Sequence, residues 1–252
     1  MKKILLSTLL ATACFIGSLS AQDAFEVQMK AYKLALKNYD LSAATNSVYV
    51  MMALKPERVD LNDSLALLYF AGERYGQAYI IGEEILKANP NRKDMLELVA
   101  VSKQNLGMVK ESLADYEKLY SADKGIYYLY QIATLQYQLK RYGECVASLD
   151  QIINNPESAQ QKVNIMLQGG SQDVPMKAAA LNVKGICALE LNQEDAAKDN
   201  FNKALEVFPD FVLPKGNLEM IAKQKAQAKP ASTTSTAPKT TTTTTKPTTA
   251  PK

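Results

Sequence analysis

Small and apolar residues recur along much of this chain at an interval of about 34 positions. Ala78 and Ser112 are 34 residues apart, as are Pro56 and Pro90, and the series continues 33 residues beyond Ser112 at Cys145. Periods between about 20 and 50 residues are typical of arrays in which each copy is one supersecondary unit. The apolar positions within a copy have helical spacing, and a proline near its end would stop the second helix. The pattern therefore predicts stacked pairs of antiparallel helices.

The repeated unit resembles the tetratricopeptide repeat, in which small residues stand at slots 8 and 20 and a proline stands at slot 32. The copy at 178–209 fits this pattern best, because Gly185, Ala197 and Pro209 occupy those slots. Small residues at slots 8 and 20 allow two helices to approach closely, while the larger apolar residues fill the seam to the next pair. One pair alone cannot bury its apolar face, whereas several stacked pairs can.

Four further copies precede the best one. They are a degenerate copy at 25–58, copies at 59–92 and 93–126, and a fourth copy that starts near Tyr127. The fourth copy is one residue short, and we expect the missing residue to lie in the turn between its two helices. The resemblance implies an all-α fold, an α-solenoid of about five helix pairs over residues 22–228.

Residues 155–175 form an insertion between the fourth and fifth copies. Asn155-Pro156 can begin a short helix that carries Val163, Met166 and Leu167 on one apolar face and ends at Gly169-Gly170. We expect a packed loop with a short helix; the alternative is a lobe that contacts a partner.

Residues 212–227 are predicted to form a C-terminal capping helix, with Leu218, Ile221 and Ala222 facing the last repeat. Residues 229–252 contain eleven threonines together with proline, lysine, serine and alanine, and no large apolar residue. We therefore predict a disordered tail. Its composition also resembles an O-glycosylated stalk.

The N-terminus predicts export. Lys2-Lys3 is followed by an apolar stretch at 4–16 and by small residues at 18–21, which is typical of a signal peptide at 1–21. We expect the exported protein to be periplasmic. The alternatives are an uncleaved anchor and lipidation at Cys14.

Composition excludes several chemistries. Without histidine there is no imidazole ligand for zinc and no histidine general base. Six of the 29 basic residues and no acidic residue lie at 1–21 and 229–252, so the body has 23 basic against 26 acidic residues. This mildly acidic body gives no indication of nucleic-acid binding. With no phosphate loop, nucleophile motif or metal-spaced cluster, we expect no enzyme, cofactor, metal or small-molecule substrate.

Removal of the signal peptide leaves two cysteines, Cys145 and Cys187. Both fall at helical positions that we expect to be buried. We interpret them as small apolar side chains rather than as a disulfide, which would need their alpha carbons within about 7 Å.

The resemblance also predicts a binding surface, because in this family slots 2, 5, 9 and 12 of each first helix point into the concave face. In the second to fourth copies these slots hold Asp60, Asp63, Leu67, Phe70, Asp94, Glu97, Val101, Gln104, Tyr128, Gln131, Leu135 and Gln138. In the fifth copy they hold Ala179, Asn182, Ile186 and Leu189.

Asp63 and Glu97 stand where co-chaperones of this family use lysine and asparagine to bind a peptide carboxylate, and two carboxylates would repel such a ligand. We expect instead an apolar floor with an acidic end, Phe70 and Leu135 as anchors, and a partner segment with apolar and basic residues. The predicted function is a non-catalytic scaffold or adaptor in the bacterial cell envelope. The alternative is an envelope-attached structural protein that acts through its cationic, threonine-rich tail.

Overall fold

The structure is a computed structural model that describes residues 23–228. The predicted signal peptide with Cys14 and the threonine-rich tail lie outside these residues. The described chain begins with a helix over 23–37. It continues with α2 (Leu41–Leu54), α3 (Leu61–Ala71), α4 (Tyr75–Ala88), α5 (Lys93–Asn105), α6 (Val109–Asp123), α7 (Ile126–Gln138), α8 (Tyr142–Asn154), the 3-10 turn η1 (Pro156–Ala159), β1 (Lys162–Leu167), β2 (Gly170–Pro175), α9 (Met176–Glu190), α10 (Glu194–Val207) and α11 (Val212–Ala228).

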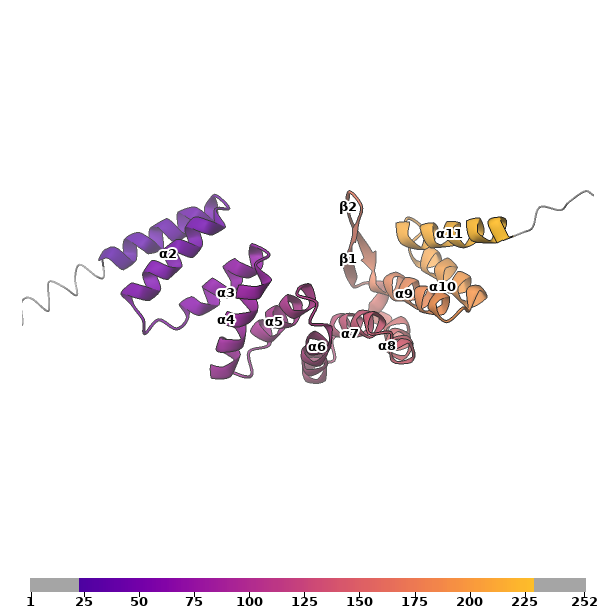
Figure 1. Cartoon of the computed structure of the whole chain (residues 1–252), viewed down its shortest axis with the longest axis horizontal. Coiled ribbons are helices and arrows are strands. Elements are labelled where there is room, and N and C mark those ends of the chain that lie inside the picture. The colour runs from indigo at the N-terminus through magenta and orange to yellow at the C-terminus, as the bar shows by residue number, and fades with distance from the viewer. Residues whose placement is uncertain (1–22, 229–252) are drawn as a thin grey trace, which may run out of the picture.

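Five successive helix pairs form an elongated arch, closed at its C-terminal end by α11 (Figure 1). The first helices of the central pairs, α5 and α7, lie on the inner side of the arch, and α6 and α8 lie on its outer side. The predicted α-solenoid of about five pairs with a capping helix is confirmed.

The same turn joins the two helices of every pair. In each turn one residue has a positive φ: Tyr39, Glu73, Gly107, Lys140 and Asn192. In each turn the amide that follows donates to a carbonyl five residues earlier, as Arg74 N does to Tyr69 O at 2.8 Å and Arg141 N does to Gln136 O at 2.9 Å. This is the hydrogen bond of a Schellman motif, which satisfies a carbonyl at the end of the first helix.

A comparison of the connections between helices shows where the array lacks one residue. The turn between α7 and α8 has the same length and hydrogen bond as the others. The connection between α6 and α7 has only residues 124–125, whereas residues 89–92 join α4 to α5. Lys124 adopts a left-handed conformation there, at φ 56°. The predicted position of the missing residue is therefore wrong, and slot 1 of the fourth copy is Ile126.

Small residues stand where the helices of a pair meet. Slot 20 is occupied in the five copies by Ala44, Ala78, Ser112, Cys145 and Ala197, and all five are fully buried. Slot 8 holds Ala66, Ala100, Ala133 and Gly185 in the last four copies, and these are also buried. A Cβ added at Gly185 would lie 2.5 Å from Cε1 of Phe201 on α10, which shows how close the two helices are.

The insertion at 155–175 differs from the sequence prediction, which placed a short helix there. η1 begins at Pro156, but the segment that follows is an antiparallel β-hairpin with Val163 paired to Val174. Polar and apolar residues alternate over positions 162–165, and burial alternates along the whole strand, with Val163 buried and Met166 exposed. Such alternation has the period of a strand. Gly169 supplies the positive φ of 89° in the connecting turn.

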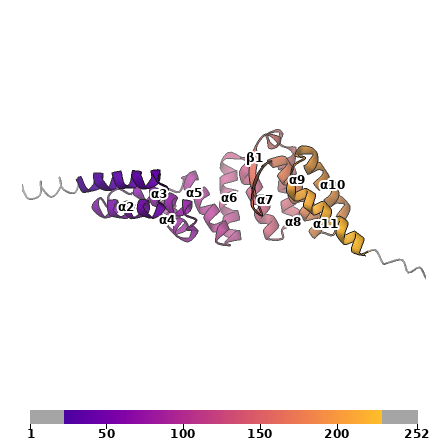
Figure 2. The same cartoon turned by 90° about the horizontal axis from the view of Figure 1, so that it is seen from above.

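The hairpin rises from the inner side of the arch between α7 and α9, as the two views in Figures 1 and 2 agree. Val163 and Val174 pack into the core formed by α7, α8 and α9. The side chain of Gln172 ties β2 to the start of α11, because it donates to Asp210 O at 2.7 Å and accepts from Val212 N at 3.2 Å.

The capping helix α11 covers the last pair. Ile221 is buried with Phe201 and Ala197, and Leu218 packs beside them, as predicted. Ala222 is exposed and does not contribute to this core, contrary to the prediction.

Gly185→Ala tests the close helix contact in the last pair. The new methyl group would meet the Phe201 ring, so we expect the free energy of unfolding to fall by about 1–3 kcal/mol in denaturant titration. Gly216→Ala on α11 is the control, because a Cβ there meets nothing within 4 Å. It should stabilise the protein by about 0.5–1 kcal/mol through helix propensity. Equal effects of the two changes would contradict the contact.

Candidate binding surface on the inner side of the arch

The predicted acidic end of the surface is paired within the chain. Arg58 forms an ion pair with Asp60 at 2.6 Å. Arg92 bridges Asp63 at 3.0 Å and Asp94 at 2.6 Å, so it links the first helices of two successive pairs. The hydrogen bond from Arg92 lowers the pKa of Asp94, and that from Arg58 lowers the pKa of Asp60. Three of the four carboxylates at the predicted acidic end are therefore already paired with an arginine of the same chain.

Glu97 has a different partner. The hydroxyl of Tyr128 on α7 donates to Glu97 Oε2 at 3.2 Å. Burial, together with the charge of Glu97, raises the pKa of Tyr128 to about 12, so the hydroxyl remains a donor at neutral pH. This bond fixes Glu97 against the neighbouring pair, and it leaves the carboxylate charge without a cation in the described ion pairs.

The apolar residues predicted for this surface differ in their exposure to solvent. Leu67 is 53% exposed, and Phe70 is half-buried, with its ring in an edge contact with Tyr75. Leu135, by contrast, is fully buried in the core between α6 and α7 and cannot contact a partner. The reason is the one-residue shift of the fourth copy, which places slot 9 at Thr134. Slots 2, 5, 9 and 12 of that copy are Tyr127, Tyr130, Thr134 and Tyr137.

The remaining predicted residues, Val101, Gln104 and Gln131, are half-buried, while Gln138 is exposed. A cavity of about 320 Å³ lies beside this part of the surface. Asp60, Asp63 and Arg92 line it together with Ile85 and other residues of α4. Its two aspartates are paired with arginine, and Glu84 of α4 adds a third carboxylate to the lining.

A larger cavity of about 580 Å³ lies between α9 and α11. Two residues predicted to point inward, Ile186 and Leu189, line it from α9, and Met220 and Ile221 line it from α11. Asn217 and Gln224 supply amide groups from α11, and Glu190 and Glu194 supply carboxylates. Ala179 and Asn182, predicted for the same surface, are buried instead.

Glu190 is held by two tyrosine hydroxyls from the preceding pair. Tyr137 Oη on α7 donates to Oε1 at 3.4 Å, and Tyr142 Oη on α8 donates to Oε2 at 3.2 Å. Burial and the nearby carboxylate raise the pKa of Tyr137, so its hydroxyl stays protonated at neutral pH. Within residues 23–228 no lysine or arginine forms an ion pair with Glu190. Sequence reasoning missed this residue because it lies one position beyond slot 12.

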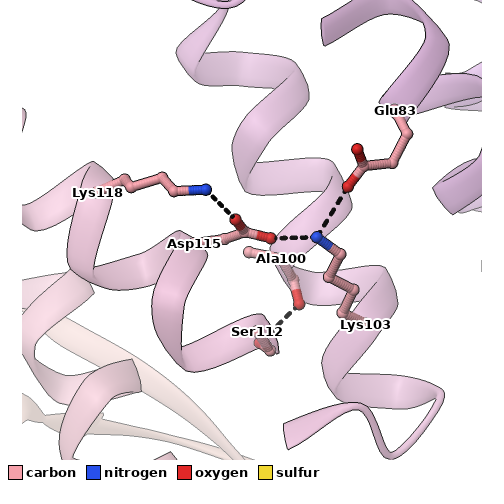
Figure 3. Close-up of polar contacts among 6 residues, drawn as sticks. All are labelled: Glu83, Ala100, Lys103, Ser112, Asp115 and Lys118. Carbon is pink, nitrogen blue, oxygen red and sulfur yellow. Dashed lines mark hydrogen bonds and ion pairs between the residues drawn. The ribbon is translucent and has the colours of Figure 1, made fainter. Parts of the chain in front are cut away.

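A separate group of charges is buried between α4, α5 and α6 (Figure 3). The ammonium of Lys103 lies 2.6 Å from Asp115 Oδ2 and 2.8 Å from Glu83 Oε1, and Lys118 lies 3.0 Å from Asp115 Oδ1. Burial lowers the pKa of Lys103, but the hydrogen bonds to Asp115 and Glu83 outweigh it, and the net shift is upward. The group joins the second pair to the third, and every charge in it has a partner.

The same two slots carry a buried polar contact in the next copy. Lys103 and Asp115 occupy slots 11 and 23 of the third copy, and Gln136 and Ser148 occupy them in the fourth. Ser148 Oγ donates to Gln136 Oε1 at 2.9 Å. Because a neutral pair fills the equivalent position, we interpret the charged group as a structural link between helices and not as a reactive site.

Residues 23–228 give no support for a metal site or for a membrane-spanning helix. No group of three or more cysteine, aspartate or glutamate side chains there is placed to hold a metal ion. Among the helices of this part of the chain, none combines the length and the apolar character needed to cross a membrane.

Comparison with known proteins identifies the repeat. The family model described as tetratricopeptide repeat matches residues 178–211. No curated protein matches the sequence. A solved tetratricopeptide repeat protein from Parabacteroides merdae ATCC 43184 is similar, with 18% identity and a TM-score of 0.64, covering 81% of this chain and 76% of the other.

Two other solved structures are also similar. YrrB, described as a TPR protein with an unusual peptide-binding site, has 14% identity and a TM-score of 0.58. The match covers 77% of this chain and 88% of the YrrB chain. A structure of MamA from residue 41 to the end, from Desulfovibrio magneticus RS-1, has 11% identity and a TM-score of 0.57. The match covers 73% of this chain and 95% of the MamA chain. At these identities the similarity shows the fold.

Replacing Lys103 tests the buried charges. Lys103→Met leaves Asp115 with the exposed Lys118 as its only cation, and we expect a loss of about 3 kcal/mol in unfolding free energy. The double change with Asp115→Leu should recover most of the loss. Lys203→Met on α10 is the control, because its exposed pair with Asp199 is screened by solvent and should contribute little. A loss for Lys103→Met as small as this control would contradict the role of the network.

The same pair of proteins gives a pH prediction. Because the pKa of Lys103 is raised above its ordinary value of 10.5, its contribution to stability is complete below that pH and is lost as the pH rises further. The stability difference between wild type and Lys103→Met should therefore narrow above pH 10.5. A difference that stays constant with pH would contradict the charge pairing.

Proposed function

This chain is a tetratricopeptide-repeat protein, and we propose from that premise that it is a non-catalytic scaffold that binds a segment of a partner protein. The binding surface is the inner side of the arch, centred on the cavity between α9 and α11. The partner is a protein or peptide, and neither a nucleic acid nor a small-molecule substrate.

The observation that carries the proposal is the combination of groups around this cavity. Its volume of about 580 Å³ lies within the range of about 300–1,000 Å³ typical of ligand sites. Ile186, Leu189 and Met220 provide apolar surface, and Met220 is 43% exposed. Glu190 at the rim is oriented by the hydroxyls of Tyr137 and Tyr142 before any partner arrives. Orientation in advance reduces the entropy lost on binding.

This arrangement defines the chemistry of the partner. An apolar side chain would fill the cavity between α9 and α11, and a neighbouring lysine or arginine would pair with Glu190. The carboxylates at Asp60, Asp63 and Asp94 are less suited to this role, because each is already paired with Arg58 or Arg92. A partner segment that competed for these aspartates would first have to displace the arginines.

The similarity to YrrB supports a peptide-binding use of the same fold, since that protein is described as having a peptide-binding site. The absence of histidine and the internal pairing of the buried charges support a scaffold in preference to an enzyme.

We place the scaffold in the bacterial cell envelope, on the basis of the signal sequence at 1–21. The alternative, attachment through the cationic tail, is separated from this proposal by deleting residues 229–252. The scaffold without its tail should keep its partner, whereas a structural protein tethered by the tail should leave the envelope fraction.

Photocrosslinking in cells tests the site and identifies the partner. A photoreactive amino acid at position 220, beside the cavity, should capture a specific protein. The same amino acid at position 147, which is exposed on the outer helix α8, is the control and should not capture it. Capture from position 147 but not from position 220 would contradict the proposed surface.

Substitutions then test the two components of the site with the captured partner. Met220→Ala should weaken binding by more than about 1 kcal/mol, as loss of an interface anchor does. Glu190→Gln keeps an acceptor for one tyrosine hydroxyl, offers the other an amide N–H to accept, and removes the charge, so association should slow and lose part of its salt dependence. Glu206→Gln on the exposed face of α10 is the matched control.

The N-terminal part of the surface provides the opposing test. Phe70→Ala and the combined changes Asp63→Lys and Glu97→Lys alter α3 and α5 and change no residue that lines the cavity between α9 and α11. If these changes weaken binding while Met220→Ala and Glu190→Gln do not, the partner occupies the surface between α3 and α7 and the proposed site is wrong.

A further inference from the structure

The two cysteines of the described chain meet in the core. Cys145 lies on α8 and Cys187 on α9, and both side chains have no exposed surface. Their sulfur atoms are 3.5 Å apart, although the residues are 42 positions apart in the sequence. Both thiols are free in this structure. The sequence prediction of burial is confirmed, but the interpretation of the two residues as small apolar side chains and not a disulfide did not foresee their direct contact, and we revise it here.

The contact lies at the junction between the fourth and fifth helix pairs. Elsewhere in the described array a connection of two to six residues joins one pair to the next, whereas η1 and the hairpin separate α8 from α9. Cys145 occupies slot 20, where a small residue lets the helices approach closely. The third cysteine of the sequence, Cys14, falls in the predicted signal peptide, so export would leave the pair with no other thiol to react with.

We propose that Cys145 and Cys187 form a disulfide that joins the fourth and fifth helix pairs across the inserted hairpin. Bonded sulfurs lie about 2 Å apart, so the two atoms must approach by about 1.5 Å. Rotation of the two side chains with a small shift of α8 against α9 provides this movement. The bond would close a loop that contains the whole insertion, η1, β1 and β2.

The oxidant is a second disulfide, either of a small thiol compound or of a thiol–disulfide exchange protein. One cysteine thiolate attacks the oxidant, which forms a mixed disulfide and releases one thiol. The other cysteine thiolate then attacks the mixed disulfide, which forms the Cys145–Cys187 bond and releases the second thiol. The protein loses two electrons and two protons, and the oxidant is reduced to two thiols.

Burial sets when this reaction can occur. The hydrogen bond with Cys187 and the burial of its side chain raise the pKa of Cys145, so this thiol is protonated and inaccessible in the folded protein. Exchange therefore takes place while the chain is folding or when α9 opens from α8. Once formed, the buried bond is protected from reduction by the same barrier.

The disulfide would also fix α9 near the cavity, because Leu189 and Glu190 follow Cys187 within one turn of the helix. The inference does not depend on the proposed function, since bond formation can be measured without a partner.

Refolding in a glutathione buffer tests the bond. The full chain carrying Cys14→Ser is refolded with oxidised and reduced glutathione, then denatured in an alkylating reagent without reductant. We expect no alkylated cysteine, a mass about 2 Da lower than the dithiothreitol-treated protein, and one proteolytic fragment that links the peptides of Cys145 and Cys187. The melting temperature of the oxidised protein should exceed that of the reduced protein by about 5 °C or more.

The variant with Cys145→Ala and Cys187→Ala is the control, and its melting temperature should be the same in both buffers. Addition of oxidised glutathione to the already folded protein should give the same bond at least tenfold more slowly than refolding, because the thiols are buried. Two alkylated cysteines after oxidative refolding, glutathione adducts on separate cysteines, or disulfides only between molecules would each overturn the inference.

Discussion

The close contact between the two helices of each pair is the constraint on which this structure depends. Slot 20 is fully buried in all five copies and never holds a residue larger than cysteine. At slot 8 of the last copy even a methyl group would overlap the ring of Phe201. Because the two helices of a pair lie so close, the larger apolar residues fill the seam to the next pair, as the fully buried Tyr116 and Leu149 do. Repetition of that seam produces the arch and leaves one helix of each pair on its inner side.

The sequence predicted the parts of the fold that repeat. The period, the small slots and the capping helix could be recognised because each signal occurs several times in phase. The fourth copy shows the limit of this reasoning. Adjacent residues on a helix point about 100° apart, so an error of one position replaces the half-buried Thr134 by the buried Leu135. The interval of 33 from Ala100 to Ala133, with Lys124 in place of the usual proline, marks the true position of the missing residue.

Features that occur once or depend on tertiary contacts were harder to predict. The hairpin was interpreted as a helix, although the alternation of polar and apolar residues over positions 162–165 has the period of a strand. The arginine pairs had a visible signal, because Arg58-x-Asp60 and Arg92-x-Asp94 are 34 residues apart. Glu190 had no such signal, since the tyrosines that hold it come from two other helices and meet it only in the folded array.

The departures from the repeat are concentrated in its C-terminal half. In the N-terminal half, the aspartates near the inner surface are paired with arginines of the same array, and the Arg92–Asp63 pair joins two neighbouring helix pairs. In the C-terminal half, an unpaired carboxylate, a cavity and an inserted hairpin lie on or next to α9. Stability in a repeat array comes from contacts between neighbours, and the insertion lengthens the connection at one such contact.

The position of the cavity between α9 and α11 therefore depends on how firmly α9 packs against α8, because the tyrosines that orient Glu190 lie on the far side of that junction. Cys145 and Cys187 meet at the same junction, within the core that also includes Val163 and Val174 of the hairpin. The hairpin and the thiol pair thus add contacts across the longest connection between helix pairs in residues 23–228. A site whose carboxylate is oriented by tyrosines of the preceding repeat requires such a junction to be rigid, and the sequence places its exceptions to the repeat where that rigidity is needed.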